Sequence, residues 1–269
     1  MHKLLLRISS LILAVLTIAL FSGSAALAAK PRPASSAPTP LGNDISWPQC
    51  NKTLPKGQTF GVVGVNGGLA NNTNPCLSTQ LAWAAQSTGA SGQPPVALYV
   101  NTANPGLTGS WWPKSNTYAS ANVTNPYGTC SGGDDAACAY MYGYAKADDD
   151  ATIRGINNPA GYRWWLDVET INSWETNKLA NAADLEGMTA YFQSIGASVG
   201  LYSTGYQWGQ IAGRVSSTSN LTNLKSWLPG ARSAATAKSN CAAAPLTTGS
   251  PVTLTQYVSG SLDYDYACL

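Results

Sequence analysis

Short apolar segments typical of β-strands alternate with helix-like segments along residues 41–269, and this alternation limits the possible folds more than any other feature. Strands separated by helices favour parallel pairing through crossovers. We therefore expect one α/β domain of about 230 residues, either a TIM-type (β/α)8 barrel, complete or irregular, or a doubly wound open sheet. Strand-like runs cover 60–65, 95–100, 163–168, 197–202, 226–228 and 252–257, and helix-like stretches cover 77–87, 136–147 and 181–195.

The first residues have the pattern of a secretory signal peptide. Lys3 and Arg7 precede an apolar run over 8–21, and the small residues Ala26-Leu27-Ala28 follow it. That run is short of the roughly 20 residues that span a bilayer. We expect a signal peptide over 1–28, a flexible Pro/Ala/Ser leader over 29–40, and a folded domain over 41–269. The mature protein is then secreted, extracellular or cell-wall associated, with no membrane attachment after cleavage.

Charge and histidine content narrow the chemistry of the mature chain. His2 is the only histidine, and without Lys3 and Arg7 the 15 basic residues fall to 13, which equals the 13 acidic residues. A neutral chain with few charges has no electrostatic surface for nucleic acid. Without histidine, Ser-His-Asp and Cys-His catalysis are excluded. No phosphate-binding glycine loop or zinc-type cysteine spacing occurs, so we expect no cofactor and no metal. We also expect a monomer.

Six cysteines in an exported chain predict three disulfides. Six cysteines allow 15 pairings, and the sequence alone does not choose among them. Proximity along the chain suggests the pairs Cys50–Cys76, Cys130–Cys138 and Cys241–Cys268.

The segment Arg163–Glu169 (RWWLDVE) is the sharpest local pattern in the chain. Side chains alternate between the two faces of a strand, so Trp165, Asp167 and Glu169 share one face while Trp164, Leu166 and Val168 share the other. The second face is wholly apolar, as expected under helices. The first face places two carboxylates at the carboxyl end of the strand, where active sites of parallel α/β folds lie. A solvated acid pair is the structural alternative.

Other acids and aromatic residues compete for the same role. Asp44 could end a first strand, and Asp263 and Asp265 follow a late strand at a two-residue spacing. Asp148–Asp150 lack the spacing of a calcium loop, and we interpret them as a solvated turn or helix end. Nine Trp and 13 Tyr against three Phe suit a surface that holds sugar rings. The aromatic candidates at strand ends or in loops are Trp47, Tyr99, Trp111, Trp112, Tyr202 and Trp208.

Four ordered segments resemble the glycoside hydrolase family 25 lysozymes. The segments starting at Asp44 (DISWPQ), Trp165 (WLDVE), Gly200 (GLYSTGY) and Gln256 (QYVSGSLD) are similar to that family's opening, central, later and closing strands. The resemblance implies a (β/α) barrel that acts on peptidoglycan or another polysaccharide. It implies Glu169 as general acid and Asp167 as its electrostatic partner. Further groove residues implied by the matching segments are Asp44, Asp263 or Asp265, Tyr202, Gln256 and Tyr257.

Two departures from that family concern the substrate. The second strand continues as Asn66-Gly67-Gly68 where the family usually has a lysine and then a glutamate, and the third reads Tyr99-Val100-Asn101 where the family often has Tyr-His-Phe. Asn101 is therefore a further candidate for substrate binding. The main alternative to a hydrolase is a glycan-binding surface protein on the same barrel without turnover, and a structural envelope protein is a third possibility.

Overall fold

The computed structural model describes residues 40–268 of the chain. The predicted signal peptide (1–28) and all of the predicted leader except Pro40 lie outside the described residues. Within the described part, no helix has the length and apolar character to cross a membrane.

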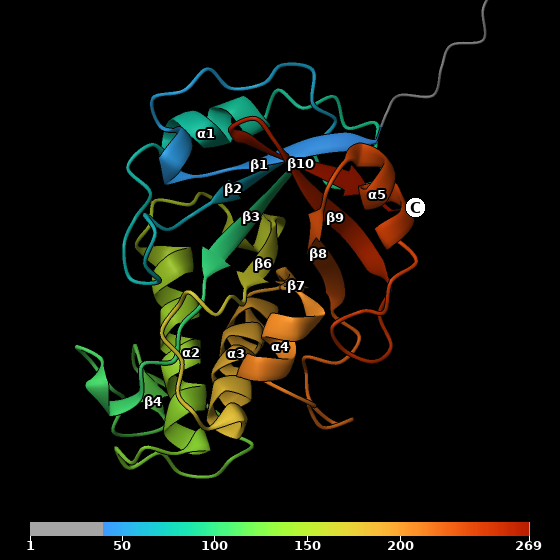
Figure 1. Cartoon of the computed structure of the whole chain (residues 1–269). Helices are drawn as coiled ribbons and strands as arrows, with labels where there is room; N and C mark the ends of the chain where they lie inside the picture. Colours follow the sequence, from blue (N-terminus) through green and yellow to red (C-terminus); the bar gives the residue numbers. More distant parts are fainter. Residues whose placement is uncertain (1–39, 269) are drawn as a thin grey trace, which may run out of the picture. The chain divides into compact units, whose positions relative to one another are not determined.

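In the described part, eight strands close into a barrel in the order β1-β10-β9-β8-β7-β6-β3-β2 (Figure 1). Neighbouring strands are parallel except that β10 runs antiparallel to both β9 and β1. A hairpin therefore replaces the last helical crossover, with Gly260 at φ +64° in its turn. The fold is a TIM-type barrel with one irregular strand, and the open-sheet alternative is excluded. The strands are β1 (Leu41–Ile45), β2 (Gly61–Gly64), β3 (Val96–Asn101), β6 (Arg163–Asp167), β7 (Ser198–Tyr202), β8 (Lys225–Ala231), β9 (Val252–Ser259) and β10 (Leu262–Ala267).

Helices cover the outside of the barrel, and the three expected from the sequence are present. The longest two, α2 and α3, lie side by side (Figure 1). Their backbones approach so closely that a Cβ on Gly143 would overlap the Asp184 backbone, and one on Gly187 would overlap the Tyr140 backbone. Asn177 caps α3 by accepting from the Leu179 and Ala180 amides. The helices are α1 (Leu77–Ala84), α2 (Ala136–Thr152), α3 (Lys178–Ser194), α4 (Gly205–Ile211) and α5 (Ala234–Asn240), with short 3-10 turns η1 (Trp47–Gln49), η2 (Gly106–Thr108) and η3 (Pro159–Gly161).

The apolar residues form separate clusters inside and outside the barrel wall. Trp165 belongs to the interior cluster with Trp227 and Phe60. Trp164 belongs to the outer cluster and stacks on Phe192 of α3, with ring centroids 4.4 Å apart. The predicted alternation along β6 is thus confirmed, since one face fills the barrel and the other packs under helices.

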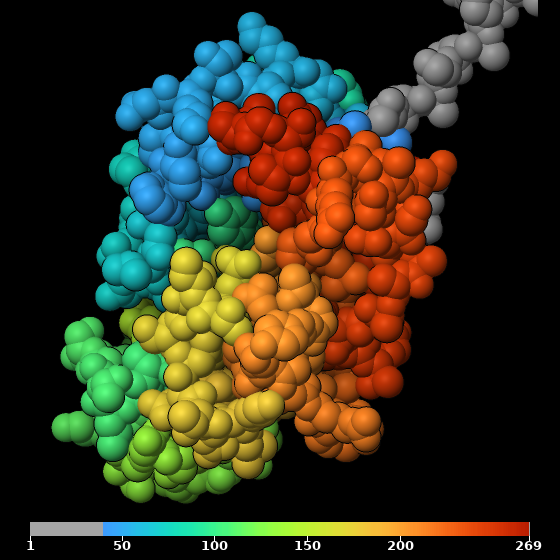
Figure 2. Space-filling view, viewed as in Figure 1, coloured from blue at the N-terminus to red at the C-terminus, as the bar shows by residue number. Residues whose placement is uncertain are grey.

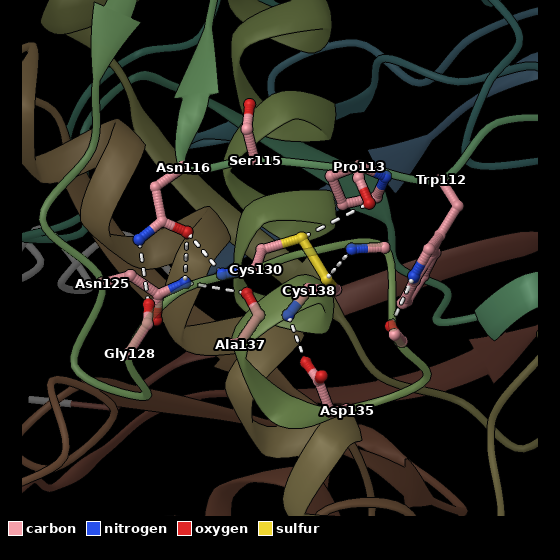
Figure 3. Close-up of a disulfide and its surroundings, with 12 residues drawn as sticks. Trp112, Pro113, Ser115, Asn116, Asn125, Gly128, Cys130, Asp135, Ala137 and Cys138 are labelled. Atoms are coloured by element: carbon pink, nitrogen blue, oxygen red, sulfur yellow. Dashed lines mark hydrogen bonds between the residues drawn. A yellow bond between two sulfur atoms is a disulfide. The ribbon is translucent and has the colours of Figure 1, made fainter.

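The three disulfides join the pairs suggested by proximity, Cys50–Cys76, Cys130–Cys138 and Cys241–Cys268. The second pair fastens a long loop to the start of α2 (Figure 3). Besides the turn η2, that loop carries only the short hairpin β4 (Thr117–Tyr118) and β5 (Ala121–Asn122). Asn116 organises its base, because its Oδ1 accepts from the Cys130 amide and its Nδ2 donates to the Gly128 carbonyl, both at 2.9 Å (Figure 3).

Candidate active site

A cleft of about 440 Å³ opens where the parallel strands end. Figure 2 shows it as a recess between the N-terminal segments in blue, the segment after β6 in yellow and the β9–β10 hairpin in red. In a parallel barrel, the carboxyl ends of all strands converge on one face, so residues far apart in sequence meet there. The candidate residues that line this cleft are Asp44, Trp47, Tyr99, Asn101, Asp167, Glu169, Tyr202, Gln256 and Asp263.

Four carboxylates share the cleft. Asp167 is the last residue of β6 and is buried, and Glu169 lies two residues further and is half-buried. Asp44 of β1 is 7% exposed and pairs in register with Asp263 of β10. Barrel closure therefore brings the first and last strands together and adds two acids to the pair from β6.

Asp44 is held by a chain of hydrogen bonds across the barrel. Gln256 Nε2 donates to Asp44 Oδ2 at 2.8 Å, and Tyr202 OH donates to Gln256 Oε1 at 3.0 Å. Burial, and next the nearby charge of Asp263, raise the pKa of Asp44 from 3.8 to about 7. This carboxyl group can therefore change its protonation state near neutral pH.

Asp167 and Glu169 have different surroundings. Burial first, and then the charges of Glu169 and Asp44, raise the pKa of Asp167 well above its ordinary value. Its Oδ1 has no hydrogen-bond partner among the described residues. Burial also raises the pKa of Glu169, and a hydrogen bond with Gln207 partly opposes that rise. The site thus holds one buried acid with an unpaired oxygen beside one acid that reaches the cleft.

The backbone around these two acids is firmly held. The Asp167 carbonyl accepts from Thr102 Oγ1 at 2.6 Å and from the Thr102 amide at 3.2 Å. The Glu169 carbonyl accepts from Trp174 Nε1 at 2.8 Å. Gln207 Oε1 of α4 accepts from the Thr170 amide at 2.7 Å. Such contacts limit how far the two carboxylates can move.

In the last strands, the structure places Asp263 and not Asp265 at the cleft, and the expectation for Tyr257 needs correction. Asp265 lies inside the barrel below the cleft, fully buried, and accepts from Trp227 Nε1 at 2.8 Å. Because β10 runs away from the cleft, Asp265, two residues after Asp263, lies deeper inside the barrel. Tyr257 follows Gln256 and so points to the opposite face of β9, where it stacks on Tyr264 at 5.3 Å.

Three aromatic candidates also lie elsewhere. Trp208 belongs to α4 and is buried in the outer core, 5% exposed. Trp111 and Trp112 stack on Tyr142 of α2, with ring centroids 6.0 and 5.2 Å apart, because their loop folds against that helix. None of the three lines the cleft.

Some residues at or behind the cleft were missed from the sequence. Trp227 lies on its floor and contacts the Tyr202 ring edge-on at 4.5 Å. Its place in the predicted strand 226–228 was the available signal. Asp150 is only 1% exposed and bonds to Asn66 Nδ2 at 2.9 Å, so its interpretation as solvated is wrong. The signal here was Arg154, one helical turn later. Among the described residues, no group of three or more acidic, cysteine or histidine side chains is arranged to hold a metal ion.

Comparison with known proteins gives matches to lysozymes. The family model described as "Lysozyme-like protein 1" matches residues 151–240, which include Asp167 and Glu169. The protein named "Probable GH family 25 lysozyme 4" of Dictyostelium discoideum is 41% identical over 49 residues, which are 18% of this chain. The aligned stretch spans 22% of that relative, about a fifth of its length.

Solved structures share the fold over most of the chain. A muramidase from Trichobolus zukalii has a TM-score of 0.50 at 18% identity, covering 85% of this chain and 93% of its own. A muramidase from Acremonium alcalophilum has a TM-score of 0.51 at 17% identity with the same coverage. A family GH25 lysozyme from Aspergillus fumigatus has a TM-score of 0.52 at 11% identity, covering 85% and 94%. The matched central segment and the curated relative thus make this chain similar in part to glycoside hydrolase family 25 lysozymes, and the solved structures share its barrel fold.

Proposed function

We propose that this protein is a secreted glycoside hydrolase that cleaves peptidoglycan or another polysaccharide by carboxylate acid catalysis. The observation that carries the proposal is the convergence of Asp44, Asp167, Glu169 and Asp263 in one open cleft. The names of the similar proteins, lysozymes and muramidases, support peptidoglycan as the first substrate to test. Three disulfides support an oxidising compartment, in agreement with the predicted signal peptide.

Glu169 is the best candidate for the general acid. It reaches the cleft, and its raised pKa favours a proton on the carboxyl group closer to neutral pH. Cleavage of a glycosidic bond requires that proton on the leaving oxygen while positive charge develops on the sugar ring. Of the remaining acids, Asp167 is nearest in sequence, and in its ionised form it would stabilise that developing charge. Activity should fall as pH rises through the pKa of Glu169, because the acid then loses its proton.

The walls of the cleft suit a sugar polymer. Trp47 is 49% exposed at the rim, and Tyr99 and Tyr202 lie further in. Such side chains combine an apolar ring face with a hydrogen-bonding tip. Among the residues that the structure describes, no lysine or arginine lines the cleft. An uncharged glycan therefore fits this cleft better than an anionic polymer.

The test compares wild type, Glu169→Gln and Glu175→Gln for release of reducing ends from bacterial cell walls and from soluble glycans. Glu175 is a matched control because it lies outside the cleft lining. We expect Glu169→Gln to lose 100-fold or more, roughly the contribution of a positioned acid, and Glu175→Gln to keep wild-type rates. Equal activity in wild type and Glu169→Gln would remove the assignment of Glu169.

A parallel sedimentation assay with insoluble cell walls separates the enzyme from the alternative. A glycan-binding protein without turnover would sediment with the walls in all three forms and would release no reducing ends. Binding without any release by wild type would therefore replace the hydrolase with that alternative on the same barrel.

A further inference from the structure

Behind the cleft, a buried polar chain connects helix α2 to the end of strand β3. Asp150, 1% exposed on α2, accepts through Oδ1 from Asn66 Nδ2 at 2.9 Å. Asn66, 2% exposed after β2, accepts through its own Oδ1 from the Asn101 amide at 2.8 Å. Neither Asp150 nor Asn66 lines the cleft, but Asn101 does.

Asp150 is one of several neighbours that orient the Asn66 amide. Asn66 Nδ2 donates to Asp150 Oδ1 and to the carbonyls of Ala70 and Asn72, which only accept, so its oxygen faces the Asn101 amide. The ladder between β2 and β3 ends at the bond from the Val65 amide to the Tyr99 carbonyl. Beyond the end of this ladder, Asn66 Oδ1 therefore takes the place of a backbone acceptor for the Asn101 amide.

The end of β3 in turn borders the acids of the site. Asn101 pairs in register with Asp167, and the next residue, Thr102, holds the Asp167 carbonyl through two hydrogen bonds. A shift of Asn101 would therefore move a cleft wall and the backbone of an acid together.

The same series of hydrogen bonds also holds a second wall of the cleft, the loop 67–73. Asn66 Nδ2 also donates to the Asn72 carbonyl at 3.2 Å, and Arg154 bridges Asp150 Oδ1 at 3.3 Å to Thr73 Oγ1 at 3.2 Å. Gly68 of this loop lines the cleft and packs so closely on Trp47 that a Cβ there would lie 2.9 Å from the indole nitrogen. The position of this loop therefore limits where the exposed Trp47 ring can lie at the rim of the cleft.

Burial makes this arrangement costly. A carboxylate removed from water with a single cationic neighbour is not a favourable way to stabilise a helix. Burial raises the pKa of Asp150 to about 7, and the hydrogen bonds from Asn66 and Arg154 only partly oppose that rise. Its Oδ2 has no partner among the described residues. An apolar residue would pack at lower cost, so the acid needs a role other than stability.

We propose that Asp150, Arg154 and Asn66 form a positioning relay that holds Asn101 and the loop 67–73 in place for substrate binding. Asp150 and Asn66 are positioning residues, since they act on the cleft through Asn101 and Gly68. The effect on substrate rests on the proposed function, whereas the effect on the Asn101 amide does not.

The test uses Asp150→Ala, the conservative Asp150→Asn and the control Asp149→Ala, each in the full mature chain. The conservative variant keeps a side-chain oxygen that accepts from Asn66. Asp149 is the preceding residue on α2, and it bonds to Tyr118 and Lys146 instead of to the relay. Should Asp150→Ala fail to fold, Asn66→Ala removes the acceptor of the Asn101 amide directly and replaces it in the comparison.

The first readout is hydrogen exchange of the Asn101 amide, which needs no substrate. We expect exchange at least tenfold faster in Asp150→Ala, and near wild-type exchange in Asp150→Asn and Asp149→Ala, because a lost buried hydrogen bond exposes this amide to local opening. Unchanged exchange in Asp150→Ala, or an equal increase in Asp149→Ala, would overturn the relay.

The second readout is KM on soluble glycan. A merely destabilised enzyme loses active molecules and therefore apparent kcat, whereas a displaced wall weakens substrate binding. We expect KM to rise about fivefold or more in Asp150→Ala and to stay within about twofold in Asp150→Asn. An unchanged KM in a folded Asp150→Ala would refute the role in binding. If wild type releases no sugar, the hydrolase proposal fails, while exchange at Asn101 still decides the relay.

Discussion

Replacing Asp44 by asparagine isolates the cost of burying a charge in the cleft. Asp44 is 7% exposed, and its pKa rises from 3.8 to about 7 in the folded protein, first through burial and next through Asp263. Asparagine has the same shape and keeps an oxygen for the 2.8 Å hydrogen bond from Gln256 Nε2. The substitution therefore removes the ionisation while it preserves the main contact.

The sign of the effect follows from proton binding. Between about pH 4 and pH 7 the folded protein holds a proton on Asp44 that the unfolded chain has already lost, so the folded state loses relative stability as pH rises. Each pKa unit corresponds to about 1.4 kcal/mol, so the change from 3.8 to about 7 sets a limit of about 4 kcal/mol above pH 7. Asparagine carries no such cost.

Urea unfolding between pH 4 and pH 8, with the disulfides intact, measures the difference. We expect Asp44→Asn to match wild type near pH 4 and to exceed its unfolding free energy at pH 8 by about 2 to 4 kcal/mol. Asp134→Asn, at an exposed aspartate outside the cleft, serves as the control for the loss of one carboxylate. A difference that is the same at pH 4 and pH 8, or a less stable Asp44→Asn at pH 8, would refute the reasoning.

Two further predictions concern the core and the charge of the cleft. Trp164→Ala should lower the unfolding free energy by about 3 to 5 kcal/mol, since Trp164 is fully buried against Phe192. Trp47→Ala, at a rim residue 49% exposed, should change stability far less, and equal losses in urea unfolding would contradict this account of the core. At pH 8, above the pKa of about 7 of Asp44, the carboxylate-lined cleft should bind uncharged glycol chitin several-fold more tightly than anionic carboxymethyl chitin at low salt, with a smaller difference in 0.5 M salt. Equal affinity in a direct binding assay at low salt would argue against that selectivity.

Local patterns predicted the features that depend on neighbouring residues. The alternation in Arg163–Asp167 was enough to separate the barrel interior from the helix-covered face. This works because successive side chains of a strand must point to opposite faces. The disulfides followed the same logic, since each joins cysteines that are near each other in the chain.

Contacts between elements that are far apart in the sequence could not be predicted in the same way. Trp111 and Trp112 are of the residue type expected in a sugar-binding groove, but their loop folds against α2 and stacks them on Tyr142. Asp150 lies in an acidic run that is typical of a solvated helix end, but it accepts a buried hydrogen bond from Asn66. Nothing within a few residues of either position specifies its partner, except that Arg154 follows Asp150 at helical spacing.

The sequence by itself determined that carboxylates are the candidate acid–base groups of the predicted mature chain, because the sequence contains no histidine after residue 2. It also predicted that Asp167 and Glu169 lie together at a strand end. Only the tertiary structure decided which other acids join them. Closure of the barrel pairs β1 with β10, which brings Asp44 beside Asp263 at the cleft and leaves Asp265 buried below. The direction of β10 sets that depth, and strand direction depends on pairing across the whole chain.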